Sequence, residues 1–128
     1  MAILHEERLD QLHPDLAAVV REAAKNTPWD IAVIETLRTR ERQQQLVNQG
    51  ASQTMKSRHL AGPDGLSRAV DIAPAPDGQI SWAWPLYHEL GNYMKDAAAK
   101  LDQTVEWGAD WPTFKDGPHW QLPWATYP

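Results

Sequence analysis

The most constraining feature of this sequence is a carboxylate in the middle of a short apolar segment. Asp71 is flanked on both sides by apolar residues in Ala69-Val70-Asp71-Ile72-Ala73, a run that is typical of a strand. A carboxylate buried in such a strand is costly unless it is paired or binds a metal ion. We therefore expect the fold to bring a partner to Asp71 from elsewhere in the chain.

Length and cysteine content limit what that partner can be. The chain has 128 residues and no cysteine. This length suits one compact domain over residues 1–128, with no second domain, and can bury a core without covalent cross-links. Disulfide bonds and thiolate metal ligands are both excluded, so a metal ion would need histidine, aspartate or glutamate ligands.

The charge balance excludes several classes of partner. Twelve basic against seventeen acidic residues give a formal net charge of −5. No basic excess is available for phosphates, which argues against a general nucleic-acid binder. No apolar run approaches membrane-spanning length, and the first ten residues lack the apolar stretch of a secretory signal peptide. We expect neither nucleic-acid binding nor membrane insertion.

Helical and strand patterns alternate irregularly, which predicts an α+β fold with a small antiparallel sheet packed by helices. Predicted helices cover residues 14–25, 39–50 and 85–101, and predicted strands cover 31–37, 69–73, 105–107 and 119–122. Pro14 suits a first helical position and Thr39 suits a helix cap. The apolar face of the longest helix is expected to consist of Leu86, Leu90, Tyr93, Met94, Ala97 and Leu101. The seven tryptophans suit core packing, with a rim around a substrate groove as the alternative.

Two histidines lie in irregular, glycine-flanked segments beside predicted strands. His59 precedes Gly62, and His119 follows Gly117. Loops at strand ends are where a rigid scaffold presents functional groups. With Asp71, the two imidazoles would complete the three-ligand set of a catalytic zinc site, which keeps an open position for water.

The spacing of these three residues is also compatible with roles that involve no metal ion. Composition alone favours such roles. His59 could be an exposed loop histidine and His119 a hydrogen-bonded core histidine. Asp71 could cap a turn or form a salt bridge with Arg58 or Arg68.

A set of residues that occur in a fixed order along the chain favours the metal site over these alternatives. The set runs along the chain as Ser57, His59, Gly62, Ala69, Asp71, Asp116 and His119. It resembles the pattern Ser-x-His-x-x-Gly-x-Ala-x-Asp followed by Glu/Asp-x-x-His of the zinc D-Ala-D-Ala carboxypeptidase and L-alanyl-D-glutamate peptidase family. That family includes phage endolysins and belongs to the Hedgehog/DD-peptidase superfamily. Further segments similar to the family, in family order, are residues 13–16, 37–39, 41–43 and 107–111.

Two positions depart from the family pattern. His59 and Asp71 are twelve residues apart, where the family usually has seven, which indicates a five-residue insertion around residues 63–67. Its proline and glycine suit a protruding loop that leaves the flanking residues in place. Gln121 stands where the family often has an acidic residue.

The resemblance implies a role for each matched residue. It implies a Hedgehog/DD-peptidase-like fold with Zn2+ held by His59, Asp71 and His119. Asp116 matches the catalytic carboxylate, a general base for the attacking water. Arg38 matches an arginine that contacts the substrate or the developing charge.

The residues by themselves support simpler alternatives. Asp116 could be an ordinary turn residue before Gly117, and Arg38 a surface residue paired with Glu35 or Glu41. Ser57 is expected to shape its loop or contact substrate, because no nucleophilic triad is visible.

The activity implied by the resemblance is hydrolysis of an amide in the peptidoglycan stem peptide. Small size and the lack of a signal peptide favour an L-alanyl-D-glutamate endopeptidase of the phage lysis type over a D-Ala-D-Ala carboxypeptidase. Such a monomeric enzyme would accumulate in the host bacterial cytoplasm and reach the wall once the membrane is breached. A substrate carboxylate would call for a further cation, for which the candidates are Arg38, Arg40, Arg58 and Arg68.

Two functions of other classes remain as alternatives. One is a non-catalytic binding module that retains the metal, because fold does not fix function. The other is a non-haem iron oxygenase, whose facial triad is also two histidines and a carboxylate. Such triads often contain His-x-Asp, and neither His59 nor His119 belongs to such a pair.

Overall fold

The computed structural model describes residues 1–52, 55–112 and 115–128 and arranges them around a five-stranded sheet. Strand order across the sheet is β1-β2-β3-β5-β4. The strands are β1 (Ile3–Leu4), β2 (Asp30–Glu35), β3 (Ala69–Ala75), β4 (Glu106–Trp107) and β5 (His119–Gln121). The pairs from β2 to β4 are antiparallel, as predicted, whereas β1 adds a parallel edge next to β2.

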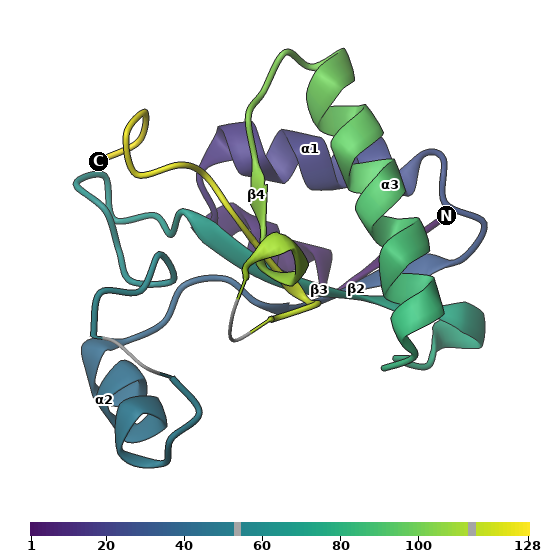
Figure 1. Ribbon diagram of the computed structural model, residues 1–128. Helices are drawn as coiled ribbons and strands as arrows, with labels where there is room; N and C mark the ends of the chain where they lie inside the picture. The colour runs from purple at the N-terminus through teal and green to yellow at the C-terminus, as the bar shows by residue number, and fades with distance from the viewer. Residues whose placement is uncertain (53–54, 113–114) are drawn as a thin grey trace.

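Three α-helices accompany the sheet, together with short 3-10 helices. The α-helices are α1 (Pro14–Ala24), α2 (Arg40–Asn48) and α3 (Trp84–Lys100), and the 3-10 helices are Glu6–Gln11, Pro76–Gly78 and Gly108–Asp110. Figure 1 shows α1 and α3 crossing each other beside the sheet, whereas α2 stands apart on the opposite side of the molecule. Within the described residues, no helix has the combination of length and apolar character that a bilayer span requires.

The core lies between the sheet and the crossed helices. Val70 and Ile72 of β3 are fully buried and belong to the same apolar cluster as Leu16 of α1 and Met94 of α3. Because side chains alternate along a strand, Asp71 faces the other side of the sheet from Val70 and Ile72. The strand thus contributes to the core with one face and presents its carboxylate on the other.

Cross-strand register gathers polar residues around Asp71. His119 of β5 lies opposite Asp71 on one side, and Glu35 of β2 lies opposite it on the other. Directly opposed residues in antiparallel strands have Cβ atoms about 5 Å apart. The sheet itself therefore brings an imidazole to Asp71 from a residue 48 positions along the chain.

The predicted helices agree closely with the structure. Thr39 caps α2 by accepting a hydrogen bond from the backbone N–H of Arg42 at 3.1 Å. His13 caps α1 in the same way, with its Nδ1 accepting from the backbone N–H of Asp15 at 3.1 Å. Both caps satisfy an N–H group that the first helical turn leaves without a partner.

Other boundaries were predicted wrongly. The strand after Ala69 continues through Pro74, which was expected to begin a turn, and pairs with Ile31 of β2. β1 and the 3-10 helix after it were not predicted, because two-residue strands carry almost no periodic signal. The buried face of α3 is also rotated: Tyr87, Gly91 and Ala98 are buried, whereas Leu101 is exposed.

A stacked pair of tryptophans explains the buried glycine of α3. The rings of Trp107 and Trp120 are nearly parallel, with centroids 5.2 Å apart, and the Trp107 indole N–H donates to the Gly117 carbonyl at 2.7 Å. A Cβ added at Gly91 would lie 2.8 Å from two ring carbons of Trp107. Because stacking and the hydrogen bond hold this ring, α3 can approach it only where a side chain is missing.

Replacing Gly91 with alanine should therefore destabilise the protein despite the better helix propensity of alanine. Overpacking costs about 1–3 kcal/mol and the propensity gain offsets up to about 1 kcal/mol, so we expect a net loss of about 1–2 kcal/mol. Urea denaturation measures the change. Asn92→Ala, at an exposed position of α3, is the matched control and should not destabilise. Equal or greater stability of Gly91→Ala would contradict the packing account.

Candidate metal centre and surrounding cleft

Three side chains distant along the chain converge on the face of the sheet opposite the core. One oxygen of Asp71, Oδ1, lies 3.2 Å from His59 Nε2 and 3.3 Å from His119 Nδ1. The three potential ligand atoms all lie within 4.8 Å of one another. The His59 and His119 side chains are buried, and that of Asp71 is 19% exposed. The structure thus brings together the three residues that were predicted as metal ligands.

The imidazole of His59 is oriented by its other ring nitrogen. His59 Nδ1 lies 2.8 Å from the backbone carbonyl of Thr36, just after β2. A carbonyl oxygen only accepts hydrogen bonds, so Nδ1 must carry the proton. This leaves the lone pair of neutral His59 on Nε2, the nitrogen that faces Asp71. Ring nitrogens of metal-binding histidines are commonly oriented in this way.

The same logic applies to His119 with the two nitrogens exchanged. His119 Nε2 lies 2.7 Å from the side-chain oxygen of Gln121, which is two residues farther along β5 and on the same face. The Gln121 amide nitrogen in turn donates to Glu106 of β4 at 2.9 Å. Because Glu106 takes the amide hydrogens, Gln121 presents its oxygen to the ring. His119 Nε2 therefore donates, and Nδ1 of the neutral ring keeps its lone pair toward Asp71.

Electrostatics favour a negatively charged Asp71. Burial alone would raise the pKa of Asp71, but the hydrogen bonds that His119 and His59 donate when their rings carry both protons, and the charges of those rings, hold it well below its usual range. Burial lowers the pKa of His119, but the hydrogen bond and charge of Asp71 outweigh this effect and raise it overall. A divalent cation between these groups would supply the same positive charge to Asp71.

The inserted loop does not displace the residues on either side of it. Gly62 and Gly65 close the loop through backbone hydrogen bonds, from Gly62 N–H to the Leu66 carbonyl at 2.8 Å and from Gly65 N–H to the Gly62 carbonyl at 3.0 Å. Asp64 accepts hydrogen bonds from the backbone N–H of Leu66 at 3.0 Å and from the Arg68 guanidinium at 2.5 Å. The extra residues form a self-contained turn, so His59 still reaches Asp71.

Asp116 lies beside the three converging residues in the same cleft. Its backbone N–H donates to the Gly108 carbonyl at 3.2 Å, and any side chain at Gly108 would collide with the Asp116 carbonyl. Burial raises the pKa of Asp116, and the nearby charge of Asp71 adds to this effect, whereas His119, His59 and Arg38 oppose it. A carboxylate with a raised pKa is better suited to accept a proton near neutral pH.

Arg38 and Ser57 also line this cleft. Arg38 forms an ion pair with Glu35 and donates to the Gln43 side chain at 2.6 Å, so its guanidinium is held in place. The pairing with Glu35 that was the simpler reading of Arg38 is thus present, but it positions Arg38 at the cleft. Ser57 Oγ accepts a hydrogen bond from the backbone N–H of His59 at 3.2 Å and so shapes the loop before His59.

The cleft around these groups has a volume of about 380 Å³. Its walls include two tryptophans, Trp111 and Trp124. The Trp111 ring centroid lies 5.1 Å from that of His119. Trp120, in contrast, stacks on Trp107 in the core. The tryptophans thus divide between core packing and the cleft rim.

The supporting contacts of the two histidines were not predicted from the sequence. Thr36 acts through its backbone carbonyl, which no sequence motif can signal. Gln121 carried a weak signal, because strand alternation places it on the same face as His119 and it departs from the family pattern. Glu106 became significant only once β4 was paired with β5.

The donor set fits a divalent transition metal. Two neutral imidazole nitrogens and one carboxylate oxygen are borderline-soft and hard ligands that suit zinc, and three protein ligands leave a coordination position for water or substrate. Among the described residues, His59, Asp71 and His119 are the group whose ligand atoms lie close enough to share an ion.

The chain is similar in sequence to known peptidases of one kind. Residues 2–121 match the family described as phage L-alanyl-D-glutamate peptidase. The chain is 36% identical over 103 residues to the L-alanyl-D-glutamate peptidase of Listeria phage A118, an alignment that covers 77% of this chain and 32% of that protein. It is 28% identical over 110 residues to the enzyme of the same name from Escherichia phage T5, covering 83% and 77% of the two chains.

A solved structure is similar along the full length. The L-Ala D-Glu endopeptidase ChiX of Serratia marcescens superposes with a TM-score of 0.90 at 39% sequence identity, covering 100% of this chain and 94% of that one. The chain therefore spans nearly all of the Serratia structure but only about a third of the Listeria phage protein.

Removing the hydrogen-bond acceptor of His119 should weaken metal binding without removing a ligand. In Gln121→Leu, His119 Nε2 loses its partner, so the ring tautomer and orientation are no longer set, and we expect zinc affinity to fall by about 10- to 100-fold. Competition with a chromophoric chelator measures the affinity. Gln79→Leu, at an exposed position away from the cleft, should bind zinc like the parent protein. An unchanged zinc affinity of Gln121→Leu would show that Gln121 does not orient His119 for metal binding.

Proposed function

The chain belongs to the phage L-alanyl-D-glutamate peptidase family, and we propose that it hydrolyses the amide bond between L-alanine and D-glutamate in the peptidoglycan stem peptide. The observation that carries this proposal is the convergence of His59, Asp71 and His119 beside Asp116 in one cleft. An amide hydrolase needs an activated water, a proton acceptor and a stabiliser of the oxyanion. The cleft contains a candidate for each.

We propose that the metal is zinc, held by His59 Nε2, His119 Nδ1 and a carboxylate oxygen of Asp71. When bound, zinc acts as a Lewis acid that lowers the pKa of water and polarises the amide carbonyl. The two histidines contribute by keeping their lone pairs directed at the site through the Thr36 and Gln121 contacts. Asp71 contributes the negative charge that offsets part of the charge of the ion.

Asp116 is proposed as the general base and then the general acid. Its carboxylate accepts a proton from the water that attacks the amide carbon. It then returns a proton to the departing amine nitrogen of D-glutamate. The raised pKa of Asp116 supports this role, because a base whose pKa lies closer to neutrality can also act as the acid that follows.

Arg38 is proposed to stabilise the oxyanion or to contact the substrate. Its guanidinium is fixed by Glu35 and Gln43, so little reorganisation is needed when charge develops on the carbonyl oxygen. Ser57 is proposed to hold the loop that carries His59 and to line the substrate path.

The site by itself would also serve a D-Ala-D-Ala carboxypeptidase. The family match and the names of the compared relatives favour the endopeptidase. A non-haem iron oxygenase would contain iron, so metal analysis of protein purified without added metal tests this alternative. Stoichiometric iron without zinc would overturn the zinc assignment.

The biological setting is proposed from the same membership. The relatives that carry a phage name suggest a role in host cell lysis, with synthesis in the host cytoplasm and action on the cell wall. We further propose that residues 1–128 act as one catalytic unit and as a monomer, because the cleft described above is built from a single chain.

Incubation with purified muropeptides should release the peptide that begins with D-glutamate. We expect the mass of a stem peptide that has lost N-acetylmuramyl-L-alanine, formed with zinc and abolished after treatment with a chelator, because the hydrolytic water needs the metal. Mass spectrometry of the products distinguishes the alternatives. Release of D-alanine instead would show a carboxypeptidase, and no product in the presence of zinc would support a non-catalytic module.

Removal of the proposed base should abolish turnover while leaving the metal in place. We expect Asp116→Asn to lower kcat by about 10²- to 10⁴-fold, the usual contribution of general acid–base catalysis, with unchanged zinc content. Steady-state kinetics and metal analysis on the same preparation measure both. Asp96→Asn, an exposed carboxylate on α3, is the matched control. Near-parental activity of Asp116→Asn would rule out this mechanism, and loss of zinc would make Asp116 a metal-site residue rather than the base.

A further inference from the structure

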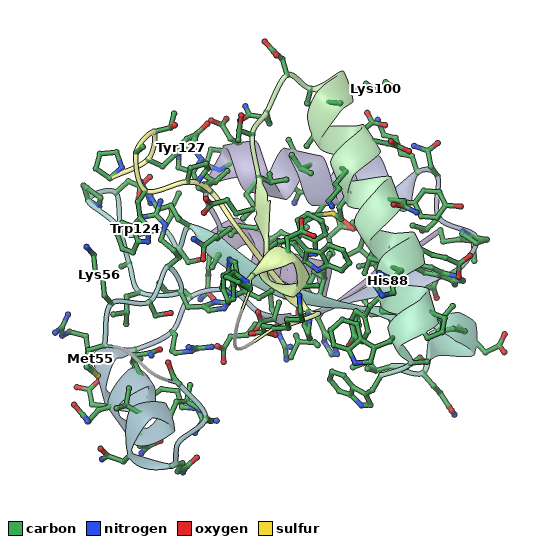
Figure 2. All side chains as sticks on the ribbon, viewed as in Figure 1. Met55, Lys56, His88, Lys100, Trp124 and Tyr127 are labelled. Atoms are coloured by element: carbon green, nitrogen blue, oxygen red, sulfur yellow. The ribbon has the colours of Figure 1, made fainter. Side chains whose placement is uncertain are left out.

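A second hollow adjoins the cleft and has no role in the mechanism above. Its volume is about 520 Å³. Lys56, Ser57, Arg58 and Trp124 line both spaces, so the hollow and the cleft lie next to each other along these residues. Figure 2 shows Trp124, Lys56 and Met55 following one another along one edge of the molecule, between the C-terminal segment and α2.

The lining of the hollow is strongly cationic, although the chain carries a net charge of −5. Its cations are Arg40, Lys56, Arg58 and Arg68. None of the described residues that line the hollow has a carboxylate side chain. The ion pair of Arg68 with Asp64 at 2.5 Å offsets part of this charge. A concentration of like charges is costly unless an anion joins it.

Two buried arginines show that this charge is incompletely neutralised. Arg68 is 7% exposed, and its Nε atom has no hydrogen-bond partner. Arg58 is 4% exposed and donates to the uncharged carbonyls of Leu122 and Tyr127. The arginines therefore form a positive wall that a ligand anion would stabilise.

Most of the remaining lining is apolar. Trp124 is 43% exposed, with the Arg58 guanidinium 3.9 Å and the Lys56 ammonium 4.9 Å from its ring centroid. The other apolar contributors are Met55, Leu60, Ala61, Pro63 and Pro128. An apolar floor beneath cations suits an anion carried on an aliphatic chain better than a heavily hydrated phosphate.

We propose that this hollow is a substrate subsite that binds an alkyl-borne carboxylate of the stem peptide next to the scissile amide. The proposal rests on the function proposed above. Two carboxylates in a stem peptide have this chemistry. D-Glutamate is joined onward through its side chain and leaves its α-carboxylate free, and a following diaminopimelate carries a second carboxylate on its own side chain.

The structure also narrows down which cations would make the contact. Arg38 is held by Glu35, Arg68 by Asp64, and Arg58 by backbone carbonyls. Lys56 and Arg40 are the exposed members of the lining. Because solvent reaches these two side chains, an entering carboxylate can contact them, so we assign the contact to them, with Arg58 and Arg68 supplying the background field.

The test uses four synthetic peptides that start from L-Ala-γ-D-Glu and end in a carboxamide. The α-carboxylate of D-glutamate is either free or amidated, and the next residue is either diaminopimelate or lysine. Each peptide is assayed with the zinc-loaded parent protein, Lys56→Gln, Arg40→Gln and the double variant. Lys100→Gln, at the far end of α3 (Figure 2), is the matched control for loss of a surface charge.

We expect the parent protein to favour a peptide that carries one of the two free carboxylates over the peptide that lacks it by about five- to tenfold in kcat/KM, mainly through KM. The carboxylate that produces the preference identifies its source. Lys56→Gln and Arg40→Gln should each lower this ratio, the double variant should bring it close to one, and Lys100→Gln should leave it unchanged. Equal use of all four peptides by the parent protein, or an undiminished preference in the double variant, would overturn the subsite.

Binding of the same peptides to Asp116→Asn tests the subsite independently of the proposed catalytic activity. If the parent protein cleaves none of the peptides, the proposed function fails, yet the subsite can still be judged from affinity. Isothermal titration calorimetry should then show tighter binding of a free-carboxylate peptide to Asp116→Asn, and the added Lys56→Gln and Arg40→Gln changes should remove that difference. Equal affinities would refute the subsite on their own.

Discussion

The arrangement around Asp71 is the interaction on which the rest of the site depends. Asp71 lies on the side of the sheet away from the core, and its carboxylate is next to two imidazoles. Each imidazole is oriented by a second contact, to the Thr36 carbonyl or to Gln121. Because these contacts determine which nitrogen carries the proton in each neutral ring, His59 Nε2 and His119 Nδ1 already face the carboxylate before any ion binds and are the nitrogens whose lone pairs an ion would take. The resulting site is organised mainly by backbone and strand geometry, which requires little rearrangement of side chains.

Strand pairing positions the residues on the sheet side of the site. Strand register places His119 and Glu35 on either side of Asp71, and Glu35 then holds Arg38 at the cleft. The same sheet uses Val70 and Ile72 to join the core between α1 and α3. Packing and chemistry are thus coupled through one strand: a shift of register by one residue would turn Asp71 into the core and expose its apolar neighbours.

The cleft and the adjoining hollow carry charges of opposite sign. In the cleft, Asp71 and Asp116 supply the negative charge that would attract a metal ion and protons. Farther along, arginine and lysine side chains over Trp124 supply positive charge. A substrate that combines an amide with a nearby carboxylate matches this polarity along its length, and a chain with a uniformly basic or acidic surface would not offer it.

By itself, the sequence determined the α+β class, most helix and strand positions, and the identity of the converging residues. Apolar periodicity, caps such as Thr39 and the ordered motif residues are local signals that survive in a single chain. Tertiary structure alone decided that a twelve-residue gap still brings His59 to Asp71, that Gln121 and Thr36 set the imidazole tautomers, and that the predicted face of α3 is rotated. It also decided that arginine and lysine residues from separate segments gather in one hollow beside the cleft. These outcomes depend on strand register and loop closure, which join residues far apart in sequence and leave no periodic trace in it.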